Sequence, residues 1–449
     1  MATATVSSSK KYVLMFGDIL ILYFSLLLTL LIRYSSDYQT ALWNQHLLPF
    51  TVVAIIFIAV FYIDDLYEPV FSTARASLLG RIIRNVIIAV IVSFGFFYLG
   101  QDRLFSIKPQ RVILIDAAIF TVVSYVWHSV FISLTKSAKV ANNILYIGQN
   151  QLVDEITQAI NSNPQLGFKV KATLNQSDNF DDLKQRCLDE KINTIVSTIH
   201  PRDNASLAKN LFDCLPLKIN FFNITNFYEK IIGKVPVTTV EQVWFLENLS
   251  ESNKNLYEVV KRVFDILLSL VLLVGALPFV PVIALMIKLS SSGPIFFVQT
   301  RTGKQGKDFK AIKFRTMVAN AETNGAQWAT KNDPRVTALG KIMRQTRIDE
   351  IPQLINVIKG EMSMIGPRPE RPEFVEELEK QIPFYKERLL VRPGLSGWAQ
   401  VAGPAYGGSR EESLEKLQYD LFYIKNRSFG LDLSIALKTI KTIITRKGQ

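Results

Sequence analysis

Four long, nearly uncharged runs occupy most of the first third of this 449-residue chain. They lie at residues 12–32, 46–63, 85–100 and 112–134. Each is close to the roughly 20 residues that a helix needs to cross the hydrocarbon core of a bilayer. The third run is short and gains length from residues 78–83, because Arg81 can extend its head group to the membrane interface. The sequence therefore predicts a transmembrane domain of four helices over residues 1–140.

Basic residues near the ends of these runs predict their orientation, because Lys and Arg gather on the cytoplasmic side. One side carries Lys10, Lys11, Arg75, Arg81, Arg84, Lys136 and Lys139, and the other carries Arg33, Arg103, Lys108 and Arg111. We therefore expect both ends of the bundle in the cytoplasm. The first run lacks a small-residue cleavage site, so we interpret it as an anchor and not as a removed signal peptide. Cys187 and Cys214 show no metal-ligand spacing and suit a reducing compartment.

Residues 141–250 alternate between strand and helix patterns, which predicts a soluble, Rossmann-like α/β domain with a parallel sheet. The expected strands are 143–147, 168–174, 194–199 and 219–224, with a helix over 151–160. The first strand leads into Gly148, but the other two glycines of a dinucleotide-binding G-x-G-x-x-G loop are missing. We expect a packing or dimerisation domain. A membrane-anchored nucleotide-sugar dehydratase or epimerase is a disfavoured alternative, because the Tyr-x-x-x-Lys match at Tyr257 and Lys261 lies outside this domain.

A fifth apolar run, residues 263–287, has basic residues at both ends and contains Pro278 and Pro281. The positive-inside tendency places both ends in the cytoplasm, and each proline removes a helix hydrogen bond. We expect a re-entrant membrane helix over 262–288 that bends near Pro278, with a kinked spanning helix as the alternative. Residues 431–447 predict either an amphipathic helix on the membrane surface or a core helix. Its apolar face would consist of Leu433, Leu437, Ile440 and Ile444.

The formal net charge is +12 and is concentrated after residue 250. Nucleic acid, an anionic membrane or a phosphorylated substrate could balance it. No nucleic-acid motif accompanies it, which favours anionic lipid and phosphate over nucleic acid. The cations lie in stiff motifs, KFRTM (313–317), IGPRP (365–369) and VRPGLSGWAQ (391–400), and arginine forks on such loops suit phosphate oxygens. Among them, TRIDEIPQL contains one acidic pair, Asp349 and Glu350.

Residues 257–449 resemble the catalytic domain of the bacterial sugar transferases, the monotopic phosphoglycosyl transferases. The matching stretches are KRVFDILLSLVLLV, SGPIFFVQTRTG, FKAIKFRTM, DPRVTALGKIMRQTRIDEIPQLINVIKGEMSMIGPRPERP, VRPGLSGWAQV and YDLFYIKNRSFGLDL. The four apolar runs, the α/β domain and residues 223–246 are similar to the long, polyprenyl-phosphate hexose-1-phosphate transferase branch. The family often has Ser-Pro at the hairpin break, whereas this chain has Leu277-Pro278. The proline retains the bend, but the serine cap is missing.

The resemblance implies an enzyme that transfers a hexose 1-phosphate from a UDP-sugar to polyprenyl (undecaprenyl) phosphate and releases UMP. The reaction would be the first membrane step of exopolysaccharide, capsule or O-antigen synthesis. Asp349 would form a covalent phosphosugar-enzyme and contact Mg²⁺, and Glu350 would support it. The expected phosphate-binding residues are Lys313, Arg315, Arg344, Arg347, Arg368 and Arg392, and Lys261 and Arg262 would lie on the polyprenyl-phosphate side. A homodimer in the bacterial cytoplasmic (inner) membrane is also implied, with multiple spans and the catalytic domain on the cytoplasmic face.

The chemistry of these residue types agrees, because a carboxylate that attacks an anionic diphosphate needs cations around both. We expect Thr346 to cap a helix that places Asp349 in its first turn, where the helix dipole favours an ionised carboxylate. The expected architecture ends with a mainly α monotopic catalytic domain over 251–449. A non-catalytic membrane scaffold for glycan assembly is the other alternative. Glucose, galactose and an acetamido sugar all remain open as the transferred group.

Overall fold

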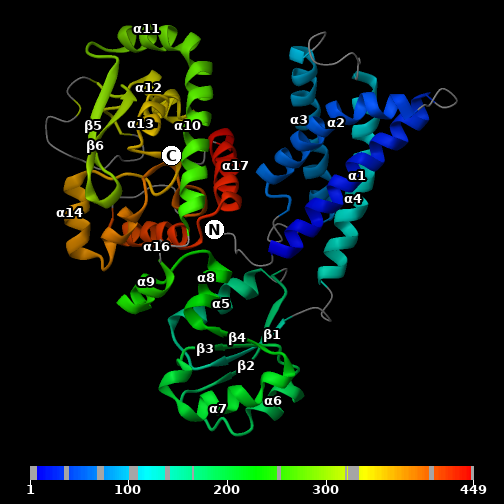
Figure 1. Ribbon diagram of the computed structural model, residues 1–449, viewed down its shortest axis with the longest axis vertical. Helices are drawn as coiled ribbons and strands as arrows, with labels where there is room; N and C mark the ends of the chain where they lie inside the picture. Colours follow the sequence, from blue (N-terminus) through cyan, green and yellow to red (C-terminus); the bar gives the residue numbers. More distant parts are fainter. Residues whose placement is uncertain are drawn as a thin grey trace. The chain divides into compact units, whose positions relative to one another are not determined.

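The computed structural model describes residues 8–34, 40–67, 75–100, 110–136, 142–163, 166–249, 254–318, 321, 333–403 and 409–445. These residues form two compact units, one over residues 3–232 and the other over residues 233–449 (Figure 1). The first unit contains the apolar helices and a small parallel sheet. The second contains all the predicted catalytic residues.

Four apolar helices begin the first unit. They are α1 (Ser8–Tyr34), α2 (Thr40–Ile63), α3 (Arg75–Gly100) and α4 (Gln110–Lys136). Their shared core includes the fully buried side chains of Leu30, Phe61 and Phe120, while Ile55 and Ile91 are exposed on the outside. Each helix is long and apolar enough to cross a membrane, and helices that are apolar on both faces are typical of a bilayer environment. The predicted apolar runs do form helices in this part of the chain, and α3 includes residues 78–83.

Buried polar side chains join α1 to α4. Asp18 accepts a hydrogen bond from the Ser124 hydroxyl (2.9 Å) and lies 2.8 Å from Nε2 of His128. About two turns further along α1, the Ser25 hydroxyl donates to Asp116 of α4 (2.5 Å). Because an unpaired polar group costs several kcal/mol in an apolar environment, these pairs fix which faces of the two helices meet.

A four-stranded parallel sheet follows, in the order β2-β1-β3-β4. Its elements are β1 (Asn142–Ile147), α5 (Gln151–Ser162), β2 (Phe168–Leu174), α6 (Leu183–Asp189), β3 (Thr194–Ser197), α7 (Ala205–Asp213), β4 (Asn220–Asn223) and α8 (Ile224–Ile232). Helices α5 and α8 cover one face and α6 and α7 the other (Figure 1). The predicted strand-helix alternation and parallel sheet are confirmed.

The single retained glycine after β1 has a structural reason. Gly148 has a φ of 85°, and a Cβ placed on it would lie 2.0 Å from the Thr198 hydroxyl oxygen. Only glycine fits that conformation and that contact. The turn then leads into α5, whose first turn is capped by Asn150 accepting from the backbone N–H of Val153 (3.1 Å).

The second unit begins earlier than the boundary at residue 250 that the sequence suggested. Val235 and Val237 lie in its core, and the indole of Trp398 donates to the Gly233 carbonyl (2.9 Å). Trp398 is buried and stacks on Phe422 with 5.9 Å between ring centroids. Trp398 therefore has a core role in this unit.

The second unit combines helices with two pairs of short strands. They are α9 (Gln242–Asn248), α10 (Asn255–Ala276), α11 (Val280–Ser290), β5 (Phe296–Thr302), β6 (Asp308–Phe314), α12 (Ala338–Gln345), α13 (Gln353–Lys359), β7 (Ser363–Ile365), α14 (Pro372–Gln381), β8 (Gly394–Ser396), α15 (Trp398–Ala402), α16 (Arg410–Asn426) and α17 (Phe429–Thr445). β5 and β6 form an antiparallel hairpin, and β7 pairs in parallel with β8.

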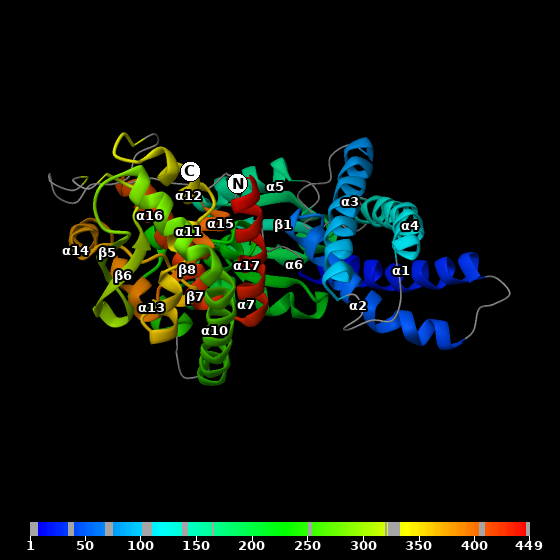
Figure 2. The ribbon, with the colours of Figure 1, turned by 90° about the horizontal axis from the view of Figure 1, so that it is seen from above.

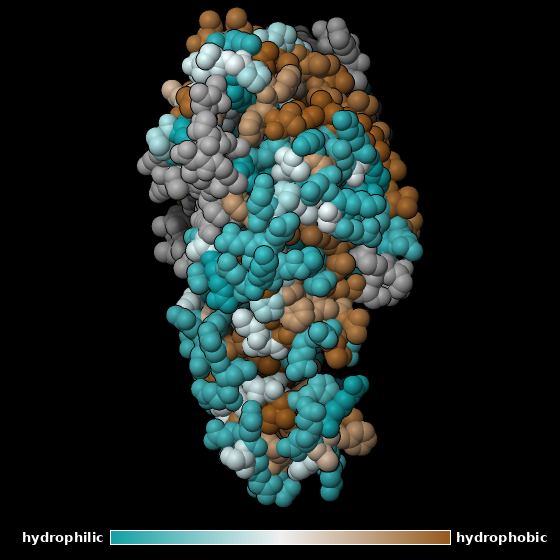
Figure 3. All heavy atoms as spheres, turned by 90° about the vertical axis from the view of Figure 1, so that its left-hand side faces the viewer, coloured by the Kyte–Doolittle hydropathy of each residue, from teal (hydrophilic) through white to brown (hydrophobic). Residues whose placement is uncertain are grey.

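The fifth apolar run forms two helices that meet at a bend. A single 3₁₀ turn over Leu277–Phe279, with Pro278 in it, joins α10 to α11. The two helices run in different directions (Figures 1 and 2). Side chains such as Leu270 and Leu285 are exposed, and the most apolar window of this segment is only 6% buried. In Figure 3, hydrophobic side chains gather at the top of the view, where α11 of the second unit lies.

Helix α17 has one face on the unit and one face outside. Ile435 and Lys438 are buried, whereas Leu433 and Ile440 of the predicted apolar face are exposed. The helix therefore packs on the core through residues outside that face. Leu433 and Ile440 remain available to an apolar environment, Leu437 is half-buried, and the side chain of Ile444 lies outside the described residues.

Candidate active site

The acidic pair lies in a short 3₁₀ turn between α12 and α13. Thr346 ends α12, and its hydroxyl donates to a carbonyl one turn back (2.9 Å). Arg347 then adopts a left-handed conformation with a φ of 59°, Asp349 and Glu350 follow, and Pro352 stands at the start of α13. The expectation that Thr346 caps a helix containing Asp349 is wrong, because the chain turns at Arg347 before the next helix begins.

Three cations hold the Glu350 carboxylate. One of its oxygens accepts from Arg368 (2.6 Å) and lies 3.1 Å from the Lys313 ammonium, and the other lies 3.4 Å from Arg347. Glu350 is only 8% exposed. Burial alone would raise its pKa, but Arg368, Lys313 and Arg347 hold the pKa well below its usual range. Glu350 is therefore an ionised carboxylate with both oxygens engaged.

Asp349 is buried next to this cluster and differs from Glu350 in its partners. Within the described part of the chain, its Oδ1 has no hydrogen-bond partner. Burial, and then the negative charge of Glu350, raise the pKa of Asp349 to about 6 against the pull of Lys313 and Arg344. The expectation that a helix dipole stabilises the ionised form is therefore not met. With a pKa of about 6 the group still ionises at neutral pH, and one of its buried oxygens has no hydrogen-bond partner among the described residues.

Asn356 holds the turn against β6 and was missed in the sequence. It is fully buried on α13, and it accepts from the backbone N–H of Ile312 (3.2 Å) and donates to the carbonyl of Lys310 (2.8 Å). These two bonds fix α13 beside the strand that carries Lys313. The only available signal was a polar residue on the face of α13 that buries Leu354 and Val357.

Two further predicted phosphate-binding residues, Arg344 and Arg315, make their hydrogen bonds to residues other than Glu350. Arg344 donates to the Thr316 hydroxyl (3.0 Å) and is close enough to lower the pKa of Asp349. Arg315 is buried and donates to the carbonyl and hydroxyl oxygens of Ser291 (2.6 and 3.0 Å). The structure therefore gathers Lys313, Arg344, Arg347 and Arg368 around the acidic pair, while Arg315 contacts the loop that follows α11.

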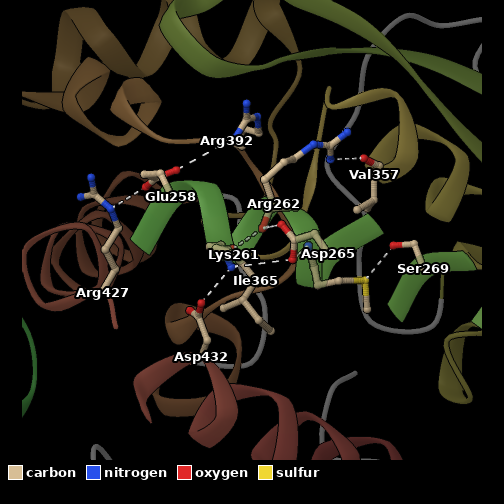
Figure 4. A network of polar contacts seen from close by, with 12 residues as sticks. Glu258, Lys261, Arg262, Asp265, Ser269, Val357, Ile365, Arg392, Arg427 and Asp432 are labelled. Carbon is tan, nitrogen blue, oxygen red and sulfur yellow. Dashed lines mark hydrogen bonds and ion pairs between the residues drawn. The ribbon is translucent and has the colours of Figure 1, made fainter. Parts of the chain in front are cut away.

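Lys261, Arg262 and Arg392 belong to a different polar network, shown in Figure 4. Lys261 pairs with Asp432 of α17 (2.9 Å), and Arg262 donates to the last carbonyls of α13, including that of Val357. Arg392 lies 4.0 Å from Glu258 of α10. This network anchors α10 to α13 and α17. We predicted that Lys261 and Arg262 lie on the polyprenyl-phosphate side. In the structure both side chains contact other residues of the protein.

The donor set near Asp349 suits a magnesium ion that is shared with a substrate. The described residues contain no group of three or more His, Cys, Asp or Glu side chains that could hold a metal alone. Mg²⁺, however, is commonly bound through one or two carboxylates together with substrate phosphates and water. The Asp349 carboxylate, one oxygen of which lacks a partner among the described residues, fits that mode of binding.

Comparison with known proteins places the chain in a family. The family model "Bacterial sugar transferase" matches residues 256–446. The chain is 30% identical over 450 residues to a UDP-glucose:undecaprenyl-phosphate glucose-1-phosphate transferase of Klebsiella pneumoniae, an alignment that covers 95% of this chain and 93% of the relative. The chain therefore belongs to the bacterial sugar transferase family, in its long branch.

Two other relatives match about half of this chain. A UDP-N-acetylgalactosamine-undecaprenyl-phosphate N-acetylgalactosaminephosphotransferase of Aeromonas hydrophila is 43% identical over 235 residues, which is 52% of this chain and 55% of the relative. A UDP-glucose:undecaprenyl-phosphate glucose-1-phosphate transferase of Xanthomonas campestris pv. campestris is 37% identical over 248 residues, 54% of this chain and 48% of the relative. The matched part of the chain spans about half the length of these two relatives.

Proposed function

We propose that this protein transfers a hexose 1-phosphate from a UDP-sugar to polyprenyl phosphate, in the form of undecaprenyl phosphate, and releases UMP. This would be the first membrane step of exopolysaccharide, capsule or O-antigen synthesis. The observation that carries the proposal is the contrast within the acidic pair. Glu350 has both oxygens engaged by three cations, whereas Asp349 keeps one buried oxygen without a partner among the described residues.

The reaction would proceed in two displacements at one phosphorus atom. Oδ1 of Asp349 attacks the sugar-bearing phosphorus, the new O–P bond forms, and the bond to the bridging oxygen breaks so that UMP leaves with the electron pair. An oxygen of polyprenyl phosphate then attacks the same phosphorus and breaks its bond to Asp349. The products are a polyprenyl diphosphate sugar and a free Asp349 carboxylate.

The cations around the pair would neutralise charge in both displacements. A carboxylate and a diphosphate repel each other, so the reaction needs positive charge on both sides of the attacked phosphorus. Lys313, Arg344 and Arg368 all lower the pKa of Asp349, and their closeness to this carboxyl group supports such a role. Mg²⁺ held by Asp349 and the diphosphate would supply further charge neutralisation for the departing UMP.

The membrane arrangement is also part of this proposal. We expect α1–α4 to span the cytoplasmic membrane as a bundle, and α10 and α11 to enter and leave it on the cytoplasmic side. The bend at Leu277–Phe279 and the exposed apolar side chains of both helices support a re-entrant hairpin. Such a hairpin would hold the catalytic turn where a water-soluble donor meets a lipid acceptor. The homodimer expected from the long branch belongs to the same proposal.

A donor panel tests the function. Purified protein in lipid nanodiscs with undecaprenyl phosphate should convert at least one of UDP-glucose, UDP-galactose, UDP-N-acetylglucosamine and UDP-N-acetylgalactosamine to a lipid-linked product, with one UMP released per product. The panel includes glucose and N-acetylgalactosamine because the relatives' names contain both. Absence of UMP with every donor would favour the scaffold alternative. A dehydratase or epimerase would instead alter the sugar and leave UDP attached.

Cysteine labelling tests the hairpin. Leu256 at the start of α10 and Leu289 at the end of α11 are both exposed, and the two native cysteines are buried. Leu256→Cys and Leu289→Cys should both react with a membrane-impermeant maleimide only after the cells are opened. Labelling of one position in intact cells and of the other only after opening would show a spanning helix.

The pH dependence of the first displacement should follow Asp349. Its pKa of about 6 means that the reactive carboxylate is lost as the pH falls through that value. The rate of UMP release without lipid acceptor should therefore rise from about pH 5 and level off by about pH 8. Glu350→Gln removes a charge that raises the Asp349 pKa, so its midpoint should move to lower pH. A flat profile across this range would contradict the assignment.

A further inference from the structure

The loop that carries Arg368 is held by its backbone at four successive positions. The Pro367 carbonyl accepts from the Gly394 N–H (2.8 Å), that of Arg368 from the Arg388 guanidinium (2.9 Å), that of Pro369 from the Arg301 guanidinium (3.0 Å) and that of Glu370 from the Thr302 N–H (2.9 Å). Loops usually run over the surface, where backbone carbonyls can bond to water, but here protein donors bind four carbonyls in a row. This loop is therefore built to be rigid.

The four donors come from separate parts of the unit. Gly394 begins β8, Arg301 and Thr302 end β5, and Arg388 lies in a 3₁₀ helix over Tyr385–Leu390. Pro367 and Pro369 add stiffness from within, because each ring fixes its own φ angle. The result is that the backbone on both sides of Arg368 has little freedom to move.

Arg388 is itself fixed in place. It is 6% exposed, and its Nε and Nη2 donate to Asp420 of α16 (3.1 and 2.8 Å) while its Nη1 donates to the Tyr385 hydroxyl (2.7 Å). A buried ion pair of this kind adds little net stability compared with apolar packing. Its geometry, however, directs one guanidinium N–H of Arg388 to the backbone carbonyl of Arg368, whose own side chain donates to Glu350.

We propose that Arg388, oriented by Asp420, and Arg301 are positioning residues that hold Arg368 against Glu350. This inference rests on the proposed function, because it assigns them to the charge cluster of the same reaction. Neither residue needs to touch the substrate. They act through the main chain of the loop, and a shift of about 1 Å in a group that neutralises transition-state charge can cost about 100-fold in rate.

The test uses first-turnover UMP release and a double-variant comparison. Arg388→Lys keeps the charge but loses the fork that reaches both Asp420 and the Arg368 carbonyl. We expect UMP release to slow by about 10- to 100-fold, with little change in the KM for the UDP-sugar and in the melting temperature. In an Arg368→Ala background the same substitution should cause no further loss, because the residue it positions is gone.

Controls separate this proposal from a general effect on folding. Lys386→Ala removes an exposed ion pair with Glu379 from the same 3₁₀ helix and should leave the rate unchanged. If Arg388→Lys lowers the melting temperature strongly, Arg301→Lys tests the second anchor, and its rate should also fall and also depend on Arg368. Multiplicative losses in the double variants, or wild-type rates in both single variants, would overturn the proposal. Absence of UMP release by the wild-type protein would instead refute the proposed function.

Discussion

Asp349→Asn is expected to abolish sugar-phosphate transfer. The amide has the shape of the carboxylate but cannot form the acyl-phosphate link, so UMP release should fall by at least about 10⁴-fold, as for enzymes that lose their covalent nucleophile. The measurement is UMP formation with and without undecaprenyl phosphate. Both should be lost together, because the first displacement precedes any role of the lipid.

The same variant, Asp349→Asn, should lose activity without losing stability. Asp349 is buried and lies beside the negative charge of Glu350, and these two effects raise its pKa. The neutral amide removes that repulsion, so the melting temperature should stay equal or rise. An inactive variant with an unchanged or higher melting temperature would separate chemistry from folding. Full activity would refute Asp349 as the nucleophile.

Arg368→Ala should have the second-largest effect. Its guanidinium makes the shortest contact to Glu350 (2.6 Å) and lowers the pKa of both carboxyl groups. Loss of one preorganised charge from a buried site typically lowers the rate by about 10²- to 10³-fold. The value to measure is kcat/KM for UMP release, and Arg368→Lys should recover part of it.

A matched control for Arg368 comes from β6. Lys310 lies on the strand that also carries Lys313, but its ammonium is exposed and donates to the Thr300 hydroxyl (2.7 Å). Lys310→Ala removes one positive charge from the same unit without touching the acidic pair. Equal losses in Lys310→Ala and Arg368→Ala would mean that the net charge matters and the position of Arg368 does not.

The sequence was sufficient for features that depend on local pattern. The apolar runs predicted α1–α4 because length and hydropathy alone decide whether a helix can face lipid on its outer side. The alternation of strands and helices predicted the parallel sheet of the first unit for a similar reason. Motif resemblance found the acidic pair and the four cations that gather around it.

The sequence was not sufficient for features that depend on contacts between distant residues. Thr346 has the residue type of a helix start but ends a helix, since the left-handed turn at Arg347 follows it. The elevated pKa of Asp349 depends on burial, which local pattern does not report. Arg388 stands outside the quoted motifs, and only the folded chain brings it to the Arg368 carbonyl.

Intact-protein mass spectrometry tests the central claim most directly. Protein free of polyprenyl phosphate, mixed with the active UDP-sugar, should gain the mass of one hexose phosphate per chain and release one UMP. Peptide mapping should place the added mass on Asp349, and addition of undecaprenyl phosphate should remove it. Steady turnover with no adduct on rapid quenching, or an adduct on another residue that clears at the rate of turnover, would contradict the covalent role of Asp349.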